Sequence, residues 1–163
     1  MHERIQHSGG YNPVANGPSL SLWEALTRQG MNAASEQQKA TAFTAYERAL
    51  TIARRLIEAP PPGRDEDCIA ALVVSHQNLA DLHADQGNHD DAARLLCQAH
   101  EFLIALSLNA ERPATLRRIA LRHSRETHVA LIRHLARYEL HPLIARTLDD
   151  ASLALSASGP ARH

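Results

Sequence analysis

Apolar residues recur at intervals of three and four along residues 36–58, and this segment ends in a run of helix-breaking residues. The spacing is typical of an amphipathic helix that buries one face. At Ala59-Pro60-Pro61-Pro62-Gly63, three prolines remove amide donors and prevent further helix. The predicted buried stripe consists of Ala42, Ala45, Tyr46, Ala49, Leu50, Ala53, Leu56 and Ile57.

Two further segments are predicted to form a helical hairpin. Asp65 is expected to cap a helix that extends through Asp85. Gly87 supplies a residue that can adopt the left-handed conformation, and Asn88 is expected to cap the next helix, residues 89–108. The inward face of the first of these helices is predicted to hold Ile69, Leu72, Val73, His76, Leu79, Ala80 and His83.

The remaining helices are predicted from capping residues and prolines. Ser21, followed three residues later by Glu24, resembles a capping box that begins the first helix. Pro113 and Pro142 suit the first turns of two more helices, which reach about residues 139 and 155. Together with the low content of glycine, proline and phenylalanine (7, 8 and 2 residues), these signals predict an all-α chain of about six antiparallel helices in three pairs.

The helical domain is expected to occupy residues 19–157. The full chain of 163 residues has 44% hydrophobic residues, which suits one domain with a sizeable core. Residues 1–18 are rich in glycine and proline and are predicted to form a flexible tail, and residues 158–163 a disordered C-terminus. No membrane span or signal peptide is predicted, and Cys68 and Cys97 are isolated. A reduced, cytoplasmic and bacterial setting is therefore expected, the last from the excess of arginine over lysine.

The three helix pairs align with one another at offsets of 50 and 52 residues. The spacing between the aligned positions is the same in all three pairs, so the alignment needs no gap. Small residues occupy many of these positions. Small side chains allow two antiparallel helices to approach each other. In each pair, the larger residue of the set Tyr46, Leu96 and Leu148 fills the space beside them. The equivalent sets are Gly30, Ala80 and Ile132; Ala42, Ala92 and Ile144; Tyr46, Leu96 and Leu148; and Ala49, Ala99 and Ala151.

Residues 78–92, followed by Leu96 and Ala99, resemble a tetratricopeptide repeat (TPR). The first pair follows the same pattern but has Gln37 in place of the usual turn glycine, and the third pair departs from it at Ile132, Glu139 and Ile144. A period of about 50 residues also exceeds the family's usual length of about 34. The resemblance implies a TPR-like α-solenoid whose first helices line a concave groove.

The resemblance further implies a non-enzymatic module that binds a protein or peptide segment in this groove, as a scaffold, adaptor or small chaperone. The groove would change from acidic to basic along the array. The residues expected to bind the partner are Glu24, Thr27, Gln77, Asp81, Asp85, Glu126, Arg133 and Arg137. A solvated helix face is the competing interpretation of these charges.

Other classes of function receive less support from the sequence. No glycine-rich phosphate loop, zinc-protease helix or serine elbow is present, so neither catalysis nor a cofactor is predicted. Histidine pairs three or four residues apart are absent, which disfavours a metal site. Seven arginines lie within residues 112–137, but no interleaved aromatics accompany them, and the net charge is −1, so nucleic acid is disfavoured. A sensor that binds a small ligand in the groove, and a homo-oligomeric structural protein such as a homodimer, remain as alternatives.

Overall fold

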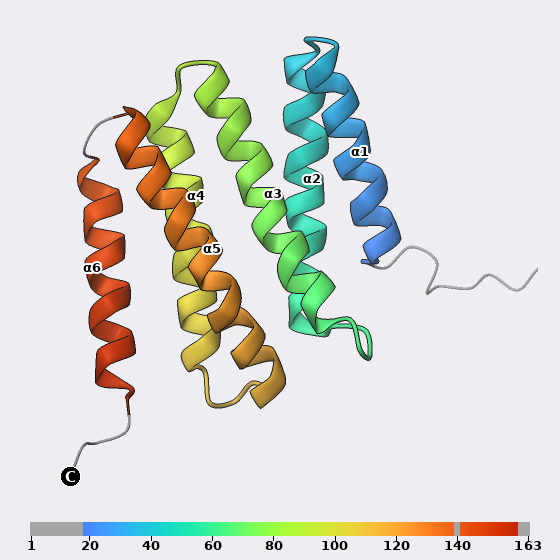
Figure 1. Ribbon diagram of the computed structural model, residues 1–163. Coiled ribbons are helices and arrows are strands. Elements are labelled where there is room, and N and C mark those ends of the chain that lie inside the picture. The colour runs from blue at the N-terminus through green and yellow to red at the C-terminus, as the bar shows by residue number, and fades with distance from the viewer. Residues whose placement is uncertain (1–17, 139–140, 160–163) are drawn as a thin grey trace, which may run out of the picture.

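A computed structural model describes residues 18–138 and 141–159, and within these ranges the chain is all-α, with six helices and no strand (Figure 1). The predicted N-terminal tail falls outside the described residues except for Pro18, and of the predicted C-terminal segment only residues 158–159 are described. The helices are α1 (Leu20–Ser35), α2 (Lys39–Glu58), α3 (Asp65–Asp85), α4 (His89–Leu108), α5 (Ala114–Tyr138) and α6 (Pro142–Ala157).

The helix starts differ from the prediction at four places, one of which is α5, where the helix begins at Ala114 and Pro113 precedes its first turn. Ser19, and not Ser21, caps α1, because the helix begins at Leu20 and the Ser19 hydroxyl oxygen accepts a hydrogen bond from the Leu22 amide at 3.0 Å. Arg64, and not Asp65, is the residue that precedes α3. The second helix begins at Lys39 rather than near residue 36, because residues 36–38 form a turn.

The turns that follow α1 and α3 have the same backbone geometry. In each, a left-handed residue (Gln37, φ 61°; Gly87, φ 79°) donates to the carbonyl three residues earlier. The next residue, Gln38 or Asn88, donates to the carbonyl five residues earlier, at 2.8 and 2.9 Å. This is the Schellman arrangement, and it recurs 50 residues apart. Gln37 therefore adopts the conformation that favours glycine, at the position where a turn glycine is missing from the sequence.

Each helix from α2 to α5 packs against the helix before it, and the first helices of successive pairs also touch, α1 with α3 and α3 with α5. Figure 1 shows the helices following one another across the molecule, with α6 at the end opposite α1. The last pair is different. The main contacts of α6 are with α4, and α6 touches α5 at only a few positions.

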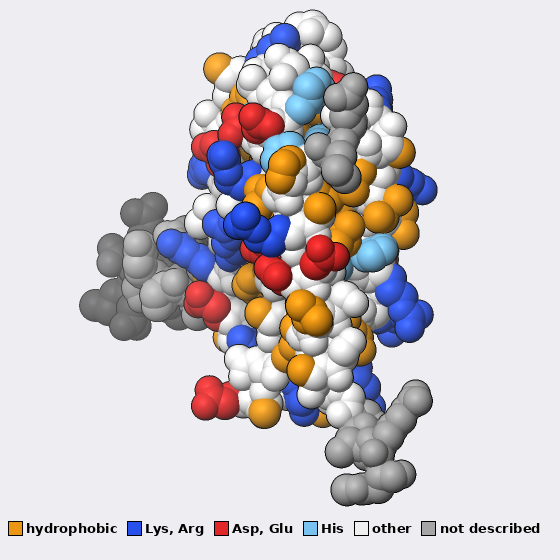
Figure 2. Space-filling view, turned by 90° about the vertical axis from the view of Figure 1, so that its left-hand side faces the viewer, with side chains coloured by type: hydrophobic (Ala, Val, Ile, Leu, Met, Phe, Trp, Pro, Cys, Tyr) orange, Lys and Arg blue, Asp and Glu red, His pale blue; other side chains and the backbone are white. Residues whose placement is uncertain are grey.

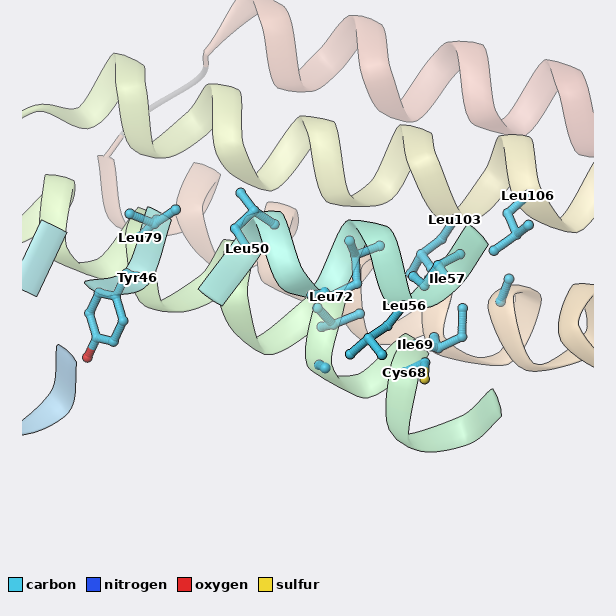
Figure 3. Packing of buried hydrophobic residues seen from close by; sticks show 14 of the residues in the cluster. Tyr46, Leu50, Leu56, Ile57, Cys68, Ile69, Leu72, Leu79, Leu103 and Leu106 are labelled. Carbon is cyan, nitrogen blue, oxygen red and sulfur yellow. The ribbon is translucent and has the colours of Figure 1, made fainter. Parts of the chain in front are cut away.

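The larger core cluster lies where α2 and α3 pack together, with contributions from α4 and α5 (Figure 3). All eight residues of the predicted α2 stripe are buried, which confirms that prediction. On α3, the predicted inward residues are buried except His83, which is partly exposed. A second, smaller cluster joins α4, α5 and α6 through Ala93, Cys97, Leu131 and Ile144.

A buried histidine lies inside the α3 part of this core. His76 is 1% exposed, and its Nδ1 lies 2.8 Å from the Leu72 carbonyl oxygen one turn earlier, a distance suited to an N–H donating to that oxygen. Burial lowers the pKa of His76 to about 4, a shift that the nearby positive charge of Arg54 increases. The neutral ring is therefore the form that the folded core accommodates at neutral pH.

The aligned small residues fit the structure in the first two pairs and partly in the third. Gly30 and Ala80 are buried, as are Ala42 and Ala92 on the helices that follow. In the third pair Ile132 is 46% exposed, so it does not share the burial of Gly30 and Ala80. The adjacent Leu131 is buried instead, in the cluster with Ala93, Cys97 and Ile144. Ile132 lies on a side of α5 that α6 leaves uncovered, because α6 packs mainly on α4.

Replacing Gly30 by alanine is expected to destabilise the fold by about 1 kcal/mol. A Cβ atom at this position would overlap Cδ1 and Cε1 of the Tyr46 ring and lie 3.2 Å from its Cγ. Overpacking costs about 1 to 3 kcal/mol or more, and the better helix propensity of alanine returns about 1 kcal/mol. Urea denaturation of both proteins measures the difference.

The matched control uses the second pair, which carries Ala80 and Leu96 at the positions equivalent to Gly30 and Tyr46. The double change Gly30→Ala with Tyr46→Leu should recover part of the stability lost by Gly30→Ala and Tyr46→Leu singly, with a coupling of about 1 kcal/mol or more. Simple additivity of the two single changes would contradict the proposed contact.

Candidate functional site

A cavity of about 340 Å³ lies between α3 and α5, and residues of α4 also line it. Its lining comes from three helices: α3 and α5 carry its charged residues, and α4 contributes Ala92 and Leu96. We call this cavity the α3–α5 groove. The complete lining is Gln77, Ala80, Asp81, Ala84, Ala92, Leu96, Ala130, Arg133, His134, Arg137 and Tyr138.

Four of the residues predicted to bind a partner line this groove. Gln77 and Asp81 lie one turn apart on α3, and Arg133 and Arg137 lie one turn apart on α5. The structure therefore brings together side chains that are more than 50 positions apart in the sequence. Small residues such as Ala84 leave space between the two helices.

The other four predicted residues do not line the groove. Asp85 is exposed one turn beyond Asp81 and acts on it through its charge. Glu24 is exposed on α1, and Thr27 is buried there, with a hydroxyl that has no hydrogen-bond partner among the described residues. Glu126 is exposed on α5 and lies 3.4 Å from Nδ1 of His123. No single cavity among those found in the described ranges joins all three helix pairs.

Opposite charges face each other across the α3–α5 groove. Desolvation and the neighbouring Asp85 raise the pKa of Asp81, and the positive charge of Arg137 partly offsets this. Neither Arg133 nor Arg137 forms an ion pair with a carboxylate within residues 18–138 and 141–159. Within the same residues, no group donates a hydrogen bond to Asp81. The Arg137 guanidinium carbon lies 5.3 Å from the centre of the Tyr138 ring. With respect to the described residues, the charged groups of the groove thus keep their bonding capacity.

Aromatic rings adjoin the groove on the side of α5. The Tyr138 ring stacks on His89 with 4.0 Å between centroids, and His134 lies 4.8 Å from the same ring. Burial, together with the charges of His89 and His141, lowers the pKa of His134. These three residues were not among those predicted from the sequence, because His89 is 49 positions from Tyr138 and no motif links them. The only available signal was the spacing of His134 and Tyr138, one helical turn apart.

The cysteines and histidines do not assemble into a reactive or metal-binding group. Cys68 and Cys97 are free and buried in separate clusters, and burial raises the pKa of both thiols. Among the described residues, no three His, Cys, Asp or Glu side chains are close enough together to hold a metal ion. In the same residues, no helix has the length and apolar character needed to cross a membrane.

The groove therefore offers groups that recognise charged and hydrogen-bonding ligands. Two guanidiniums one turn apart can each donate two parallel hydrogen bonds to a carboxylate or phosphate. Opposite them, the carboxylate of Asp81 accepts hydrogen bonds, and the amide of Gln77 both donates and accepts. A ligand that lies between α3 and α5 can thus meet acceptors on one wall and donors on the other.

Comparison with known proteins gives one match. The model of the DUF2753 family, described as a protein of unknown function, matches residues 21–163. No curated protein and no solved structure matches the chain. Because the family match covers the six helices and most of the sequence, the chain belongs to the DUF2753 family.

Proposed function

We propose that the protein is a non-enzymatic, TPR-like interaction module that holds a polypeptide segment in the α3–α5 groove. One observation carries the proposal: Asp81 faces Arg133 and Arg137 across a cavity, and these charges are not satisfied by one another in ion pairs. These exposed charges form no ion pairs among the described residues, so they can bind a ligand that enters the cavity.

The repeated local geometry supports the TPR-like solenoid within this proposal. The Schellman turns after α1 and α3 are 50 residues apart, and buried small residues recur at the same offset. The contacts of α1 with α3, of α3 with α5, and of α4 with α6 are those that a stack of helix pairs makes. The third pair is its divergent member, because α5 and α6 contact each other so little.

The polarity of the groove indicates which segment it suits. An acidic side chain of the segment would meet Arg133 and Arg137, and backbone amides would meet Gln77 and Asp81. The groove is open to solvent, and alanines on both walls leave room for an extended chain. We therefore propose a segment with one or more acidic residues as the ligand.

A small anionic molecule is the second candidate, and the size of the cavity favours it. About 340 Å³ lies within the range of small-molecule sites, and Tyr138 and Leu96 offer apolar contact beside the arginines. Such a ligand would raise the melting temperature of the protein alone, whereas a polypeptide partner would remain bound through a pull-down and appear in its mass spectrum.

The test blocks the groove without changing its charge. Ala84→Trp places a large ring between α3 and α5, and Ala105→Trp, on an exposed position of α4, makes the same change outside any groove lining. The wild-type protein and both variants are used to capture partners from the source cell, followed by mass spectrometry. We expect the same partner with wild type and Ala105→Trp, and at least about a tenfold loss with Ala84→Trp. Undiminished capture by Ala84→Trp would exclude the groove.

A further inference from the structure

A second cavity, distinct from the α3–α5 groove, lies between α5 and α6. It has a volume of about 470 Å³, and α4 contributes His100 and Ile104 to its lining. The cavity exists because α6 packs mainly on α4 and touches α5 at only a few positions. We call it the α5–α6 groove. Figure 2 looks onto the side of the molecule that α6 occupies and shows hydrophobic, basic and histidine side chains on that face.

The lining of the α5–α6 groove is mostly apolar. Its apolar residues come from all three helices and are Ile104, Leu121, Val129, Leu148, Ala151 and Leu155. A cavity of about 450 Å³ between α1 and α2 is similar in size, but its lining is mainly polar and includes Arg28, Gln29 and Glu36. The composition of the lining, and not the volume, therefore distinguishes the α5–α6 groove. A mostly apolar lining with a few polar groups is typical of sites for small molecules.

A buried histidine places a hydrogen-bond acceptor in this lining. His100 is 3% exposed, and its Nδ1 lies 2.7 Å from the hydroxyl oxygen of Thr127. That hydroxyl donates its only proton to the Ser124 carbonyl oxygen at 2.9 Å, so it accepts from His100, and Nδ1 carries the hydrogen. Burial and the charge of His128 lower the pKa of His100, so the ring is neutral at pH 7. Nε2 of His100 is therefore an acceptor.

This acceptor has no partner among the described residues. No group there donates a hydrogen bond to Nε2 of His100, and Nε2 is not one of the fully enclosed polar atoms. It is therefore open to the α5–α6 groove, which His100 lines. An occupant made only of apolar atoms would leave this buried acceptor unpaired, which is unfavourable. The occupant consequently needs a hydrogen-bond donor at this point.

A single cationic side chain lies where the groove opens to solvent. Arg125 is an exposed residue of the lining and forms no ion pair among the described residues, whereas Arg122, on the same helix, is paired with Glu66. No acidic side chain is among the described residues that line the groove. The guanidinium of Arg125 can donate two parallel hydrogen bonds to a carboxylate. The groove therefore suits an occupant with one negative charge.

We infer that the α5–α6 groove binds a small, mostly apolar carboxylic acid that also carries a hydroxyl group. The apolar body lies against Leu121 and Leu148, the hydroxyl donates to Nε2 of His100, and the carboxylate accepts from Arg125. Hydroxylated aromatic acids combine these three features. The site is separate from the α3–α5 groove, so it does not depend on the function proposed for that groove.

The first experiment compares three probes that differ in one group each. 6-Hydroxy-2-naphthoate has the apolar rings, the hydroxyl donor and the carboxylate, whereas 6-methoxy-2-naphthoate lacks the donor and 2-naphthol lacks the negative charge. Isothermal titration calorimetry of the full chain at pH 7 is expected to show that the hydroxynaphthoate binds at least about tenfold more tightly than either analogue. Equal affinity for the hydroxylated and methylated acids, or no binding of the hydroxynaphthoate at about 1 mM, would overturn the inference.

The second experiment locates the bound probe. Ser152→Trp, at an exposed residue of the lining, fills the α5–α6 groove and should weaken binding of the hydroxynaphthoate by at least about tenfold. Leu153→Trp puts the same ring on a residue that is 70% exposed and outside the lining, and Ala84→Trp blocks the α3–α5 groove. Both should bind the probe as wild type does. Undiminished binding by Ser152→Trp, or a loss with Ala84→Trp, would place the probe elsewhere and overturn the assignment.

The third experiment tests the two polar contacts. His100→Asn keeps a donor near the Thr127 hydroxyl oxygen but has no acceptor at the position of Nε2, so it should remove the preference for the hydroxylated acid over its methyl ether. A general loss of stability does not change this preference, because both acids bind the same folded protein. Arg125→Gln should weaken binding of both acids by about tenfold, whereas Arg118→Gln, exposed on α5 outside the lining, should not. A preference that survives His100→Asn, or acid binding that is unaffected by Arg125→Gln, would contradict the proposed contacts.

Discussion

Replacing Arg133 and Arg137 together by glutamate is expected to abolish or strongly weaken partner capture while the helical fold is retained. Both side chains are exposed on one wall of the α3–α5 groove, so their replacement removes no core packing. It exchanges two planar donors for two carboxylates that face Asp81 and would repel an acidic segment. Pull-down from the source cell and circular dichroism measure the two halves of this result.

The matched control reverses Arg54 and Arg55, which are exposed on α2 and outside the groove lining. Capture should survive this change. If both double variants lose binding equally, the attraction is a nonspecific effect of charge. Binding kinetics add a further distinction: loss of a contact at the rim mainly slows association and alters its salt dependence, whereas loss of a desolvated contact speeds dissociation.

Acidification is expected to remove about 3 kcal/mol of folding stability through His76 alone, as pH falls from 6.5 toward 4. The pKa of His76 is about 4 in the folded chain and about 6.5 when unfolded, so in this window the unfolded state binds a proton that the fold excludes. Stability is therefore unaffected above pH 6.5 and decreases below it. Burial also lowers the pKa values of His100 and His134, which act in the same direction.

The contribution of His76 can be isolated with His76→Asn, which keeps a donor near the Leu72 carbonyl oxygen and does not titrate. Urea denaturation at pH 7 and pH 4.5 gives the free energy of unfolding of each protein. The variant will be less stable at pH 7, because a smaller side chain replaces the ring. Its loss between the two pH values should nevertheless be smaller than that of wild type. Equal losses would mean that His76 does not titrate as described.

Much of the helical structure could be predicted, because the relevant signals are local. The three prolines after residue 59 end α2 where expected, and α4 has the predicted limits because Gly87 fixes the turn before it. The buried stripe of α2 followed from its spacing alone. Ser21 was the wrong cap, because two serines compete within three residues and capping chemistry does not choose between them.

The arrangement of the third pair could not be predicted, because it depends on which neighbour a helix chooses. The repeat alignment placed Ile132 with Gly30, but α6 packs on α4, and Ile132 faces outward. The charged half of the α3–α5 groove did follow from the alignment of α3 with α5. Its aromatic side did not, since the contact of His89 with Tyr138 joins residues that no local pattern connects.

The attachment of α6 mainly to one neighbour, α4, has a consequence for local unfolding. Most helices here are held on two sides, so opening one of them requires breaking contacts with both neighbours. By contrast, α6 can separate from α4 while the larger cluster around α2 and α3 stays intact. Sub-global opening of this kind requires less free energy than global unfolding. Amide hydrogens of α6 should therefore exchange with solvent well before those of α3, and a partner that covers α6 would slow that exchange.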